Sequence, residues 1–278
     1  GKPAFLQGTS QLLLNLFKNI IGTPTNTKPV FSAQSTDNVL NYITAHDNLT
    51  LYDTLAMGTN SYKSADADAL LLKRAKIGYT ALMTSQGSTF IHGGDEMFRS
   101  KEASGSAGET FTDSKTGRIF CHNSYDASDA INRISWSNVY SSNPVGSFSN
   151  YNVSANGYKL YKYVQGLISL RKSSKAFRLS DSLIASNDIT LSDTTQTGLS
   201  IGYKIADSAS SAVYYVFLNS GTTDVTFTVK DVDFTRESVS VIVDQTSSGT
   251  DKITTPVGVT PANGSVKLEA LTSAVIKM

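Results

Sequence analysis

The chain contains little that would cross-link it or give it a net charge. A single cysteine, Cys121, excludes an internal disulfide and a cysteine-based zinc site. The 24 Lys and Arg residues nearly balance 23 Asp and Glu residues, so no excess of positive charge is available to hold nucleic acid. No apolar run in the sequence is long enough to span a bilayer. With 278 residues, 40% of them hydrophobic, the sequence predicts a globular protein without nucleic-acid partners or membrane insertion.

The composition changes near Ser180, which predicts one domain over residues 1–180 and another over residues 181–278. The second part is rich in Thr, Ser and Val, and its apolar residues alternate with polar ones between turn residues. The alternating segments are residues 199–205, 212–219, 225–230, 238–244, 265–268 and 273–277. This regular spacing predicts an antiparallel β-sandwich.

The first part mixes helical and strand patterns. Apolar residues at helical spacing predict helices over residues 13–21, 66–86 and 160–172. Buried strands are predicted at residues 39–45 and 88–92, whereas residues 95–157 show no strong period. A strand, a helix and a strand in this order form a βαβ unit, which implies a parallel sheet with helical crossovers.

Carboxylates follow both predicted strands of the first part. Asp47 comes after the first strand, and Asp95 and Glu96 come after the second. The three histidines are not spaced as a helical metal pair, and no G-x-S-x-G nucleophile elbow is present. Strand-end carboxylates carry the chemistry of barrel enzymes, and paired carboxylates cleave glycosidic bonds. The alternative is that Asp47 only ends a strand, because Asp is common in turns.

Four segments resemble motifs of type I pullulanases, which are glycoside hydrolases of the α-amylase superfamily. Residues 41–53 resemble the seventh barrel strand and its end, and residues 87–101 resemble the eighth. Residues 123–136 resemble the loop that follows, and residues 170–174 resemble the end of the last barrel helix. The four motifs occur in the family's order, and the match, which includes the β-rich remainder, spans nearly the whole chain. The resemblance implies the last two strands and helices of a (β/α)₈ TIM barrel, followed by the family's C-terminal β-sandwich.

In that family the reaction is hydrolysis of α-1,6-glucosidic linkages in pullulan, starch or glycogen, with retention. The resemblance assigns Asp47 the role of the strand-seven Asp, which stabilises the transition state by holding hydroxyls of the distorted sugar. It implies that His46 contacts a neighbouring hydroxyl and that Asn48 supports the turn. Further substrate contacts are expected from Arg99, Asp129 and Asn132.

Other polar residues near these motifs are open to structural interpretations. Asp95 and Glu96 are adjacent, and adjacent residues on an extended segment point to opposite faces, so a structural role is expected for both. For Arg99 and Lys101 a sugar contact and an anchor of the loop are equally compatible with the sequence. Trp136 is expected in the core, with stacking on a glucose ring as the alternative.

The chain departs from the family because it contains no counterpart of the first six barrel strands. The family's nucleophile and general acid lie on those strands, so the isolated chain is expected to be inactive. Its expected partners are an α-glucan and either an N-terminal remainder of the barrel or a second copy that exchanges elements. No cofactor is required by carboxylate chemistry. Structural calcium, which the family often binds, would be held elsewhere in the enzyme.

Two alternatives to the debranching enzyme remain. One is a non-catalytic fragment that binds α-glucan or another protein, and the other is a relative of the α-1,4-cleaving amylases. The loop of residues 123–136 favours the pullulanase type. The resemblance implies an extracellular or bacterial cell-surface location. Because the first residues do not form a signal peptide, any targeting signal is expected outside this chain.

Overall fold

The structure is a computed structural model that describes residues 5–7, 16, 20, 35–58, 67–103, 108–114, 116–140, 155–179, 189–191, 198–207 and 211–278. The chain divides into two compact units, which are described separately. The first unit comprises Gly1–Asn41, Lys76–Thr89 and Tyr163–Met278. The second comprises Tyr42–Ala75 and Phe90–Lys162.

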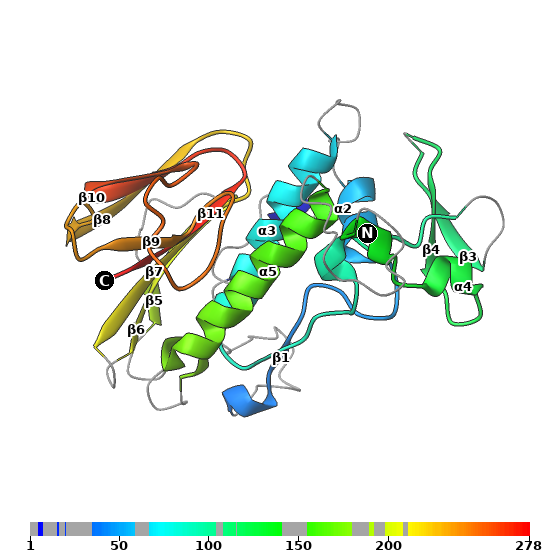
Figure 1. Cartoon of the computed structure of the whole chain (residues 1–278), viewed down its shortest axis with the longest axis horizontal. Helices are drawn as coiled ribbons and strands as arrows, with labels where there is room; N and C mark the ends of the chain where they lie inside the picture. Colours follow the sequence, from blue (N-terminus) through cyan, green and yellow to red (C-terminus); the bar gives the residue numbers. More distant parts are fainter. Residues whose placement is uncertain are drawn as a thin grey trace. The chain divides into compact units, whose positions relative to one another are not determined.

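The first unit contains two antiparallel sheets, which Figure 1 shows as separate layers. The larger sheet has the strand order β5-β6-β7-β11-β9, and the smaller one pairs β10 with β8. The strands are β5 (Ile189–Leu191), β6 (Ser200–Asp207), β7 (Ala212–Asn219), β8 (Val225–Asp233), β9 (Ser240–Val243), β10 (Val259–Leu268) and β11 (Thr272–Lys277). The six strands predicted from alternation are therefore confirmed. β10 begins earlier than predicted, and the short strand β5 was missed.

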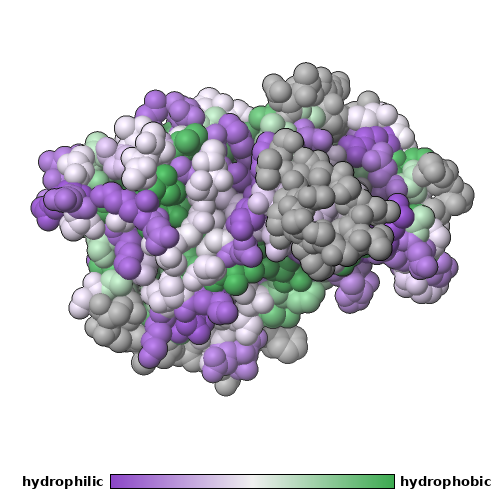
Figure 2. All heavy atoms as spheres, viewed as in Figure 1, coloured by the Kyte–Doolittle hydropathy of each residue, from purple (hydrophilic) through white to green (hydrophobic). Residues whose placement is uncertain are grey.

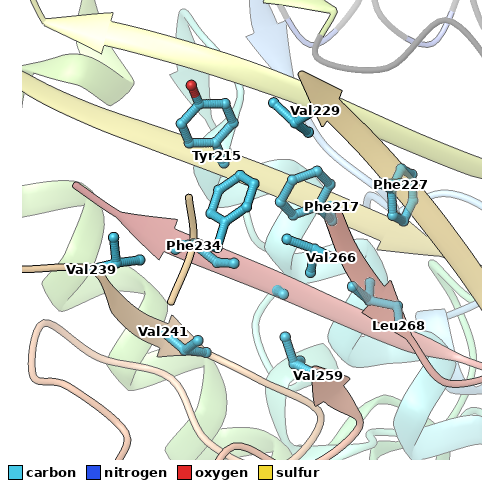
Figure 3. Packing of buried hydrophobic residues seen from close by; sticks show 12 residues of the cluster. Tyr215, Phe217, Phe227, Val229, Phe234, Val239, Val241, Val259, Val266 and Leu268 are labelled. Atoms are coloured by element: carbon cyan, nitrogen blue, oxygen red, sulfur yellow. The ribbon is translucent and has the colours of Figure 1, made fainter. Parts of the chain in front are cut away.

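A cluster of buried apolar side chains lies between the two sheets (Figure 3). Alternate residues of each strand enter it, because side chains of a strand point to opposite faces with a period of two. Phe217 of β7 packs against Phe227 of β8 with ring centroids 4.9 Å apart. Phe234, in the connection after β8, meets Tyr215 edge-on at 5.1 Å. On the face shown in Figure 2, the surface of these sheets is mainly hydrophilic or neutral, with apolar residues in small separate areas.

The helices α3 (Ala67–Thr84) and α5 (Asn156–Ser173) each begin in the second unit and end in the first, and their C-terminal parts cover the other face of the larger sheet. Buried hydroxyl groups join them to the sheet. The hydroxyl of Thr80 in α3 lies 3.2 Å from the Tyr163 hydroxyl of α5 and 3.0 Å from the Ser273 hydroxyl of β11. The Tyr203 hydroxyl of β6 lies 2.5 Å from the hydroxyl of Thr84. These bonds satisfy polar groups that would otherwise be buried at a cost. Both helices confirm the predictions from helical spacing.

Arg171, near the end of α5, binds the connection between α3 and β2 (Ser88–Thr89). Its guanidinium donates to the carbonyl oxygens of Met83 at 3.0 Å, Ser85 at 2.6 Å and Gly87 at 2.6 Å. The side chain is buried, and this burial lowers the pKa of Arg171 to about 10. Planar donors of this kind suit several acceptors at once, so one residue holds the turn that leads into β2.

The parallel pair predicted for the first part of the chain is present but short. β1 (Leu40–Asn41) pairs with β2 in parallel, with Leu40 opposite Ser88. The predicted extents of residues 39–45 and 88–92 were wrong. Among the described residues these two strands pair only with each other, and a two-stranded ladder is marginal without further strands. Of the predicted first helix, over residues 13–21, only residues 16 and 20 are among those the structure describes.

The second unit contains more regular structure than the sequence predicted. α2 (Leu51–Gly58) follows the first strand-end motif, and the hairpin β3 (Glu109–Thr112) and β4 (Ile119–Asn123) lies beside the short helix α4 (Asp129–Asn132) in Figure 1. The hairpin escaped prediction because most residues of β3 are solvent-exposed, which leaves no apolar alternation. A small core of Met97, Val139 and Tyr140 holds the segment after β2 against the residues before α5.

Candidate functional site

The segment that follows β1 presents its polar residues to solvent. The side chains of His46 and Asp47 are 84% and 81% exposed, with His46 Nε2 3.5 Å from Asp47 Oδ1. Asn48 has a φ of 64°, in the left-handed region that Asn tolerates better than most residues. The chain therefore turns sharply just after Asp47, and the carboxylate stands free of the packed interior.

A buried lysine holds this turn by a hydrogen bond to its backbone. Lys101 is 1% exposed. Its ammonium group donates to the carbonyl oxygen of Asn48 at 2.5 Å and lies 3.3 Å from the hydroxyl of Ser124. The backbone N–H of Lys101 donates to Asp53 Oδ2 at 2.8 Å, and the Ser100 hydroxyl donates to Asp53 Oδ1 at 2.5 Å. Burial lowers the pKa of Lys101 and raises the pKa of Asp53.

Asp95 lies beneath the same segment and is 1% exposed. Its carboxylate accepts hydrogen bonds from the hydroxyl of Thr44 and from the backbone N–H of Leu51, the latter at 3.3 Å. Burial raises the pKa of Asp95 to about 6, and the nearby charge of Glu96 acts in the same direction. Glu96 itself accepts a bond from the N–H of Gly94 at 2.9 Å. Asp95 thus binds the segment that follows β1, whereas Glu96 bonds within its own turn.

The side chains of Arg99 and Asn132, which were predicted to bind substrate, make internal hydrogen bonds. Arg99 is 9% exposed, and its guanidinium lies 3.1 Å from His92 Nε2 and donates to the carbonyl oxygen of Asn132 at 2.5 Å. The amide of Asn132 donates to the carbonyl oxygens of Ser124 at 2.6 Å and Ala127 at 3.1 Å. These two residues therefore fix the loop after β4 against the loop after β2.

Asp129 and Trp136 face solvent near this loop. Asp129 is exposed at the start of α4. Trp136 is 52% exposed, so the expectation that it lies in the core was wrong. Its ring centroid is 6.4 Å from that of Tyr140, whose side chain is buried. The helical turn around Trp136 is a single 3-10 turn, Trp136–Asn138, and none of its residues is buried.

The polar network reaches residues that sequence reasoning did not single out. Thr44 and Asp53 lie within the first motif but were not identified as partners of Asp95 and Lys101. The sequence offered one signal for Asp53, which stands among apolar residues of α2. A carboxylate buried in a helix needs hydrogen-bond donors from elsewhere in the chain. Cys121 is a buried free thiol, with Sγ 3.4 Å from the carbonyl oxygen of Asn123.

Two further features are absent from the described part of the chain, a membrane-spanning helix and a metal-binding cluster. None of the described helices is both long and apolar enough to cross a membrane. Groups of three or more His, Cys, Asp and Glu side chains that could hold a metal ion are also absent from the residues that the structure describes.

Comparison with known proteins shows which proteins this chain resembles. Residues 182–278 match the model of the family described as SpuA C-terminal. The fold matches pullulanase catalytic modules, with helices and mostly antiparallel sheets. The resemblance to pullulanases that the motifs indicated is therefore confirmed.

Among the curated relatives is pullulanase A of Streptococcus pneumoniae, which is 32% identical over 100% of this chain and 23% of its own length. The catalytic module of the pneumococcal SpuA, described as a glycogen-degrading virulence factor, superposes with a TM-score of 0.86 and 28% identity over 100% of this chain and 40% of that one. The Group B Streptococcus pullulanase SAP, solved with maltotetraose, gives a TM-score of 0.85 and 30% identity over 100% of this chain and 36% of that one. The chain thus spans about a quarter of the length of the curated pullulanase.

Proposed function

We propose that this chain is part of a debranching glycoside hydrolase that cleaves α-1,6-glucosidic linkages in pullulan, starch or glycogen with retention. Residues 1–180 would supply the last two strands and helices of a (β/α)₈ barrel, and residues 181–278 a C-terminal β-sandwich. The observation that carries the proposal is the exposed Asp47 in the segment after β1, whose turn is held by a buried polar network, in a chain that aligns with pullulanases over its whole length.

In this proposal Asp47 stabilises the oxocarbenium-like transition state. An exposed carboxylate beside the sharp turn at Asn48 is free to accept hydrogen bonds from two sugar hydroxyls. Such bonds strengthen as positive charge develops on the ring, and they lower the barrier without tightening substrate binding equally. The nucleophile and the general acid would come from barrel strands that have no counterpart in this chain. The isolated chain is therefore expected to be inactive.

The proposed substrate is an α-glucan, and related proteins support this choice. SAP was solved with maltotetraose and SpuA is described as glycogen-degrading. His46 would contact a hydroxyl next to the one held by Asp47. Asp129 is exposed and could make a similar contact. Arg99 and Asn132 bond to the loops around them, so in this proposal they would contact a sugar that lies against the surface of those loops. As for the pullulanases it resembles, we propose an extracellular or bacterial cell-surface location.

The partner that would complete the barrel follows from the short parallel pair. Among the described residues β1 and β2 pair only with each other, and their ends carry the exposed side chains of Tyr42 and Phe90, whose ring centroids lie 6.3 Å apart. Neighbouring strands would cover such edges and apolar side chains. They would come from an N-terminal remainder of the barrel or from a second copy.

Reconstitution tests the proposed function. The 278-residue chain is mixed with a polypeptide that supplies the first six barrel strands of a pullulanase, and reducing ends released from pullulan are measured. We expect activity from the mixture and none from either part alone. Asp47→Asn should lower kcat by at least about 100-fold, because the variant keeps the size of the side chain but loses the charge. The matched control is Asp251→Asn, an exposed carboxylate of the β9–β10 connection, which should leave kcat unchanged.

The same experiment separates the alternatives. Glucan binding without hydrolysis, unaffected by Asp47→Asn, would support a non-catalytic binding fragment instead. Hydrolysis of amylose without hydrolysis of pullulan would support a relative of the α-1,4-cleaving amylases. Release of reducing ends by the purified chain alone would contradict the proposal that its catalytic set is incomplete.

A further inference from the structure

Lys101 is a buried cation whose partners are neutral. The side chain is 1% exposed, and its ammonium group binds the carbonyl oxygen of Asn48 and the hydroxyl of Ser124. In the described part of the chain no carboxylate lies within ion-pair distance of this ammonium group. Burial lowers the pKa of Lys101 and outweighs the charges of Asp53 and Asp95, which favour its charged form. Burying a charge without a direct ion pair is costly. The two neutral acceptors are therefore the direct partners that fix the position of the ammonium group.

The first partner of Lys101 lies directly after the proposed catalytic carboxylate. The carbonyl oxygen of Asn48 belongs to the residue with a φ of 64°, where the chain reverses after Asp47. A bond from a charged donor to this oxygen fixes the plane of the following peptide, and charge-assisted bonds are the stronger kind. Because the Asp47 side chain is 81% exposed, its position is set by the backbone of this turn rather than by packing.

The second partner connects Lys101 to the loop after β4. The hydroxyl of Ser124 lies 3.3 Å from the ammonium group, and the carbonyl oxygen of Ser124 accepts a bond from the amide of Asn132. Arg99 in turn donates to the carbonyl oxygen of Asn132. One ammonium group thus joins the turn that carries Asp47 to the loop that contains Asn132 and Asp129.

We propose that Lys101 is a positioning residue that sets the place of Asp47 relative to the loop after β4. The proposal rests on the proposed function, in which Asp47 acts on the substrate. Lys101 does not touch the sugar in this scheme. Its ammonium group holds the turn at Asn48 so that the carboxylate is in place before substrate binds, and such preorganisation reduces the barrier of the chemical step.

The contacts of Lys101 allow its side chain to be tested apart from its backbone. The N–H of residue 101 donates to Asp53, and its carbonyl oxygen accepts from the N–H of Cys121 at 2.9 Å. Both bonds persist whatever side chain stands at this position. Lys101→Met keeps most of the length and volume of the side chain and removes only the ammonium group. Lys159→Met, at an exposed position of α5 in the same unit, is the matched control.

The first measurement is made on the 278-residue chain by NMR. The carbonyl ¹³C resonance of Asn48 reports the hydrogen bond from Lys101 directly. In Lys101→Met we expect it to move upfield, while the N–H of Leu51, which donates to Asp95, keeps its chemical shift. Lys159→Met should change neither. An unchanged Asn48 carbonyl resonance in Lys101→Met would overturn the proposal, and loss of the dispersed spectrum would indicate a role in folding instead.

The second measurement is kinetic and uses the reconstituted enzyme acting on pullulan. Lys101→Met should lower kcat by about 10- to 100-fold with little change in KM, since a displaced catalytic group costs rate more than binding. In the Asp47→Asn background the same substitution should have little further effect, because Lys101 acts through Asp47. Additive losses in the double variant would refute the positioning role.

Two further results keep this test separate from that of the proposed function. If Asp47→Asn does not change kcat, the role proposed for Asp47 is wrong, whatever Lys101→Met does. If Asp47→Asn abolishes activity while Lys101→Met retains the full kcat, only the positioning role is wrong. Where Lys101→Met does not fold, Lys101→Arg keeps the charge but not the geometry of the donor, and it should lower kcat in the same way. Full kcat in Lys101→Arg would again overturn the proposal.

Discussion

Replacing Asp95 by Asn is expected to stabilise the chain above pH 6 and to have little effect near pH 4. Asp95 is 1% exposed, and its oxygens accept bonds from Thr44 and from the N–H of Leu51. An Asn at this position keeps both contacts, because its carbonyl oxygen accepts from Leu51 and its amide donates to the Thr44 hydroxyl, which is free to rotate. The substitution therefore removes a buried charge while leaving the hydrogen bonds in place.

The magnitude follows from the pKa of Asp95. Burial raises this pKa from 3.8 to about 6 in the folded chain. Between these values the folded state holds more protons than the unfolded state, so the free energy of unfolding falls as the pH rises. Because each pKa unit is worth about 1.36 kcal/mol, this difference between the two pKa values corresponds to a loss of about 3 kcal/mol in the free energy of unfolding. Asp95→Asn should therefore raise the free energy of unfolding by about 3 kcal/mol at pH 8 and by almost nothing at pH 4.

Neighbouring groups modify this pH dependence but are present in both proteins. The charge of Glu96 raises the pKa of Asp95 further, and that of Arg99 opposes the shift. The pKa of His92 is lowered by burial and by the charge of Arg99. Its contribution has the opposite sign, since a neutral buried histidine loses stability as the pH falls below its ordinary pKa. The difference between the variant and the original chain isolates Asp95.

The assay is urea unfolding of both proteins between pH 4 and pH 8, together with a ¹³C NMR titration of the Asp95 carboxyl group. Asp251→Asn, at an exposed position, is the control and should give a difference near zero at every pH. A stability difference that is the same at pH 4 and pH 8, or a carboxyl group that titrates near its ordinary value, would refute the reasoning.

The remaining predictions concern packing and hydrogen bonds in the first unit, measured as free energies of unfolding in urea. Arg171→Met leaves three backbone carbonyls without their donor and should destabilise the chain by at least about 3 kcal/mol, whereas Lys172→Met, exposed on the same helix, should change it by less than about 0.5 kcal/mol. Gly166→Ala would place its Cβ 2.1 Å from the carbonyl oxygen of Ser248 and should destabilise by more than about 1 kcal/mol. Gly249→Ala meets nothing within 4 Å and should not. Equal effects within either pair would contradict the structure.

Much of the fold could be predicted from local patterns. The strands around Phe217 and Ile276 alternate or are continuously apolar, and α3 and α5 carry apolar residues at helical spacing. These signals are strong because each element buries a face, and burial imposes a period on the sequence. The β3–β4 hairpin and α2 were missed because one is largely exposed and the other is short. The extent of β1 was overestimated because strand length depends on the partners that pair with it.

The candidate site was predictable only in part. Asp47 and His46 were identified because they lie within one contiguous motif, and the structure places both side chains in solvent. The reconstitution experiment tests their proposed roles. Arg99 and Asn132 were predicted to bind sugar, yet the structure shows them bonded to the protein itself. A sequence shows which polar residues are present but not which way their side chains turn.

The sequence by itself determined that the chain resembles pullulanases, that its second part is rich in antiparallel strands, and that a carboxylate follows the first parallel strand. These features depend on residues close together in the chain. Only the tertiary structure decided what holds the carboxylate in place. Lys101 reaches the carbonyl oxygen of Asn48 across 53 residues of sequence, and Asp95 accepts the hydroxyl of Thr44 across 51. Such contacts leave no period or motif in the sequence, because they arise when the packing of distant segments removes water from their polar groups.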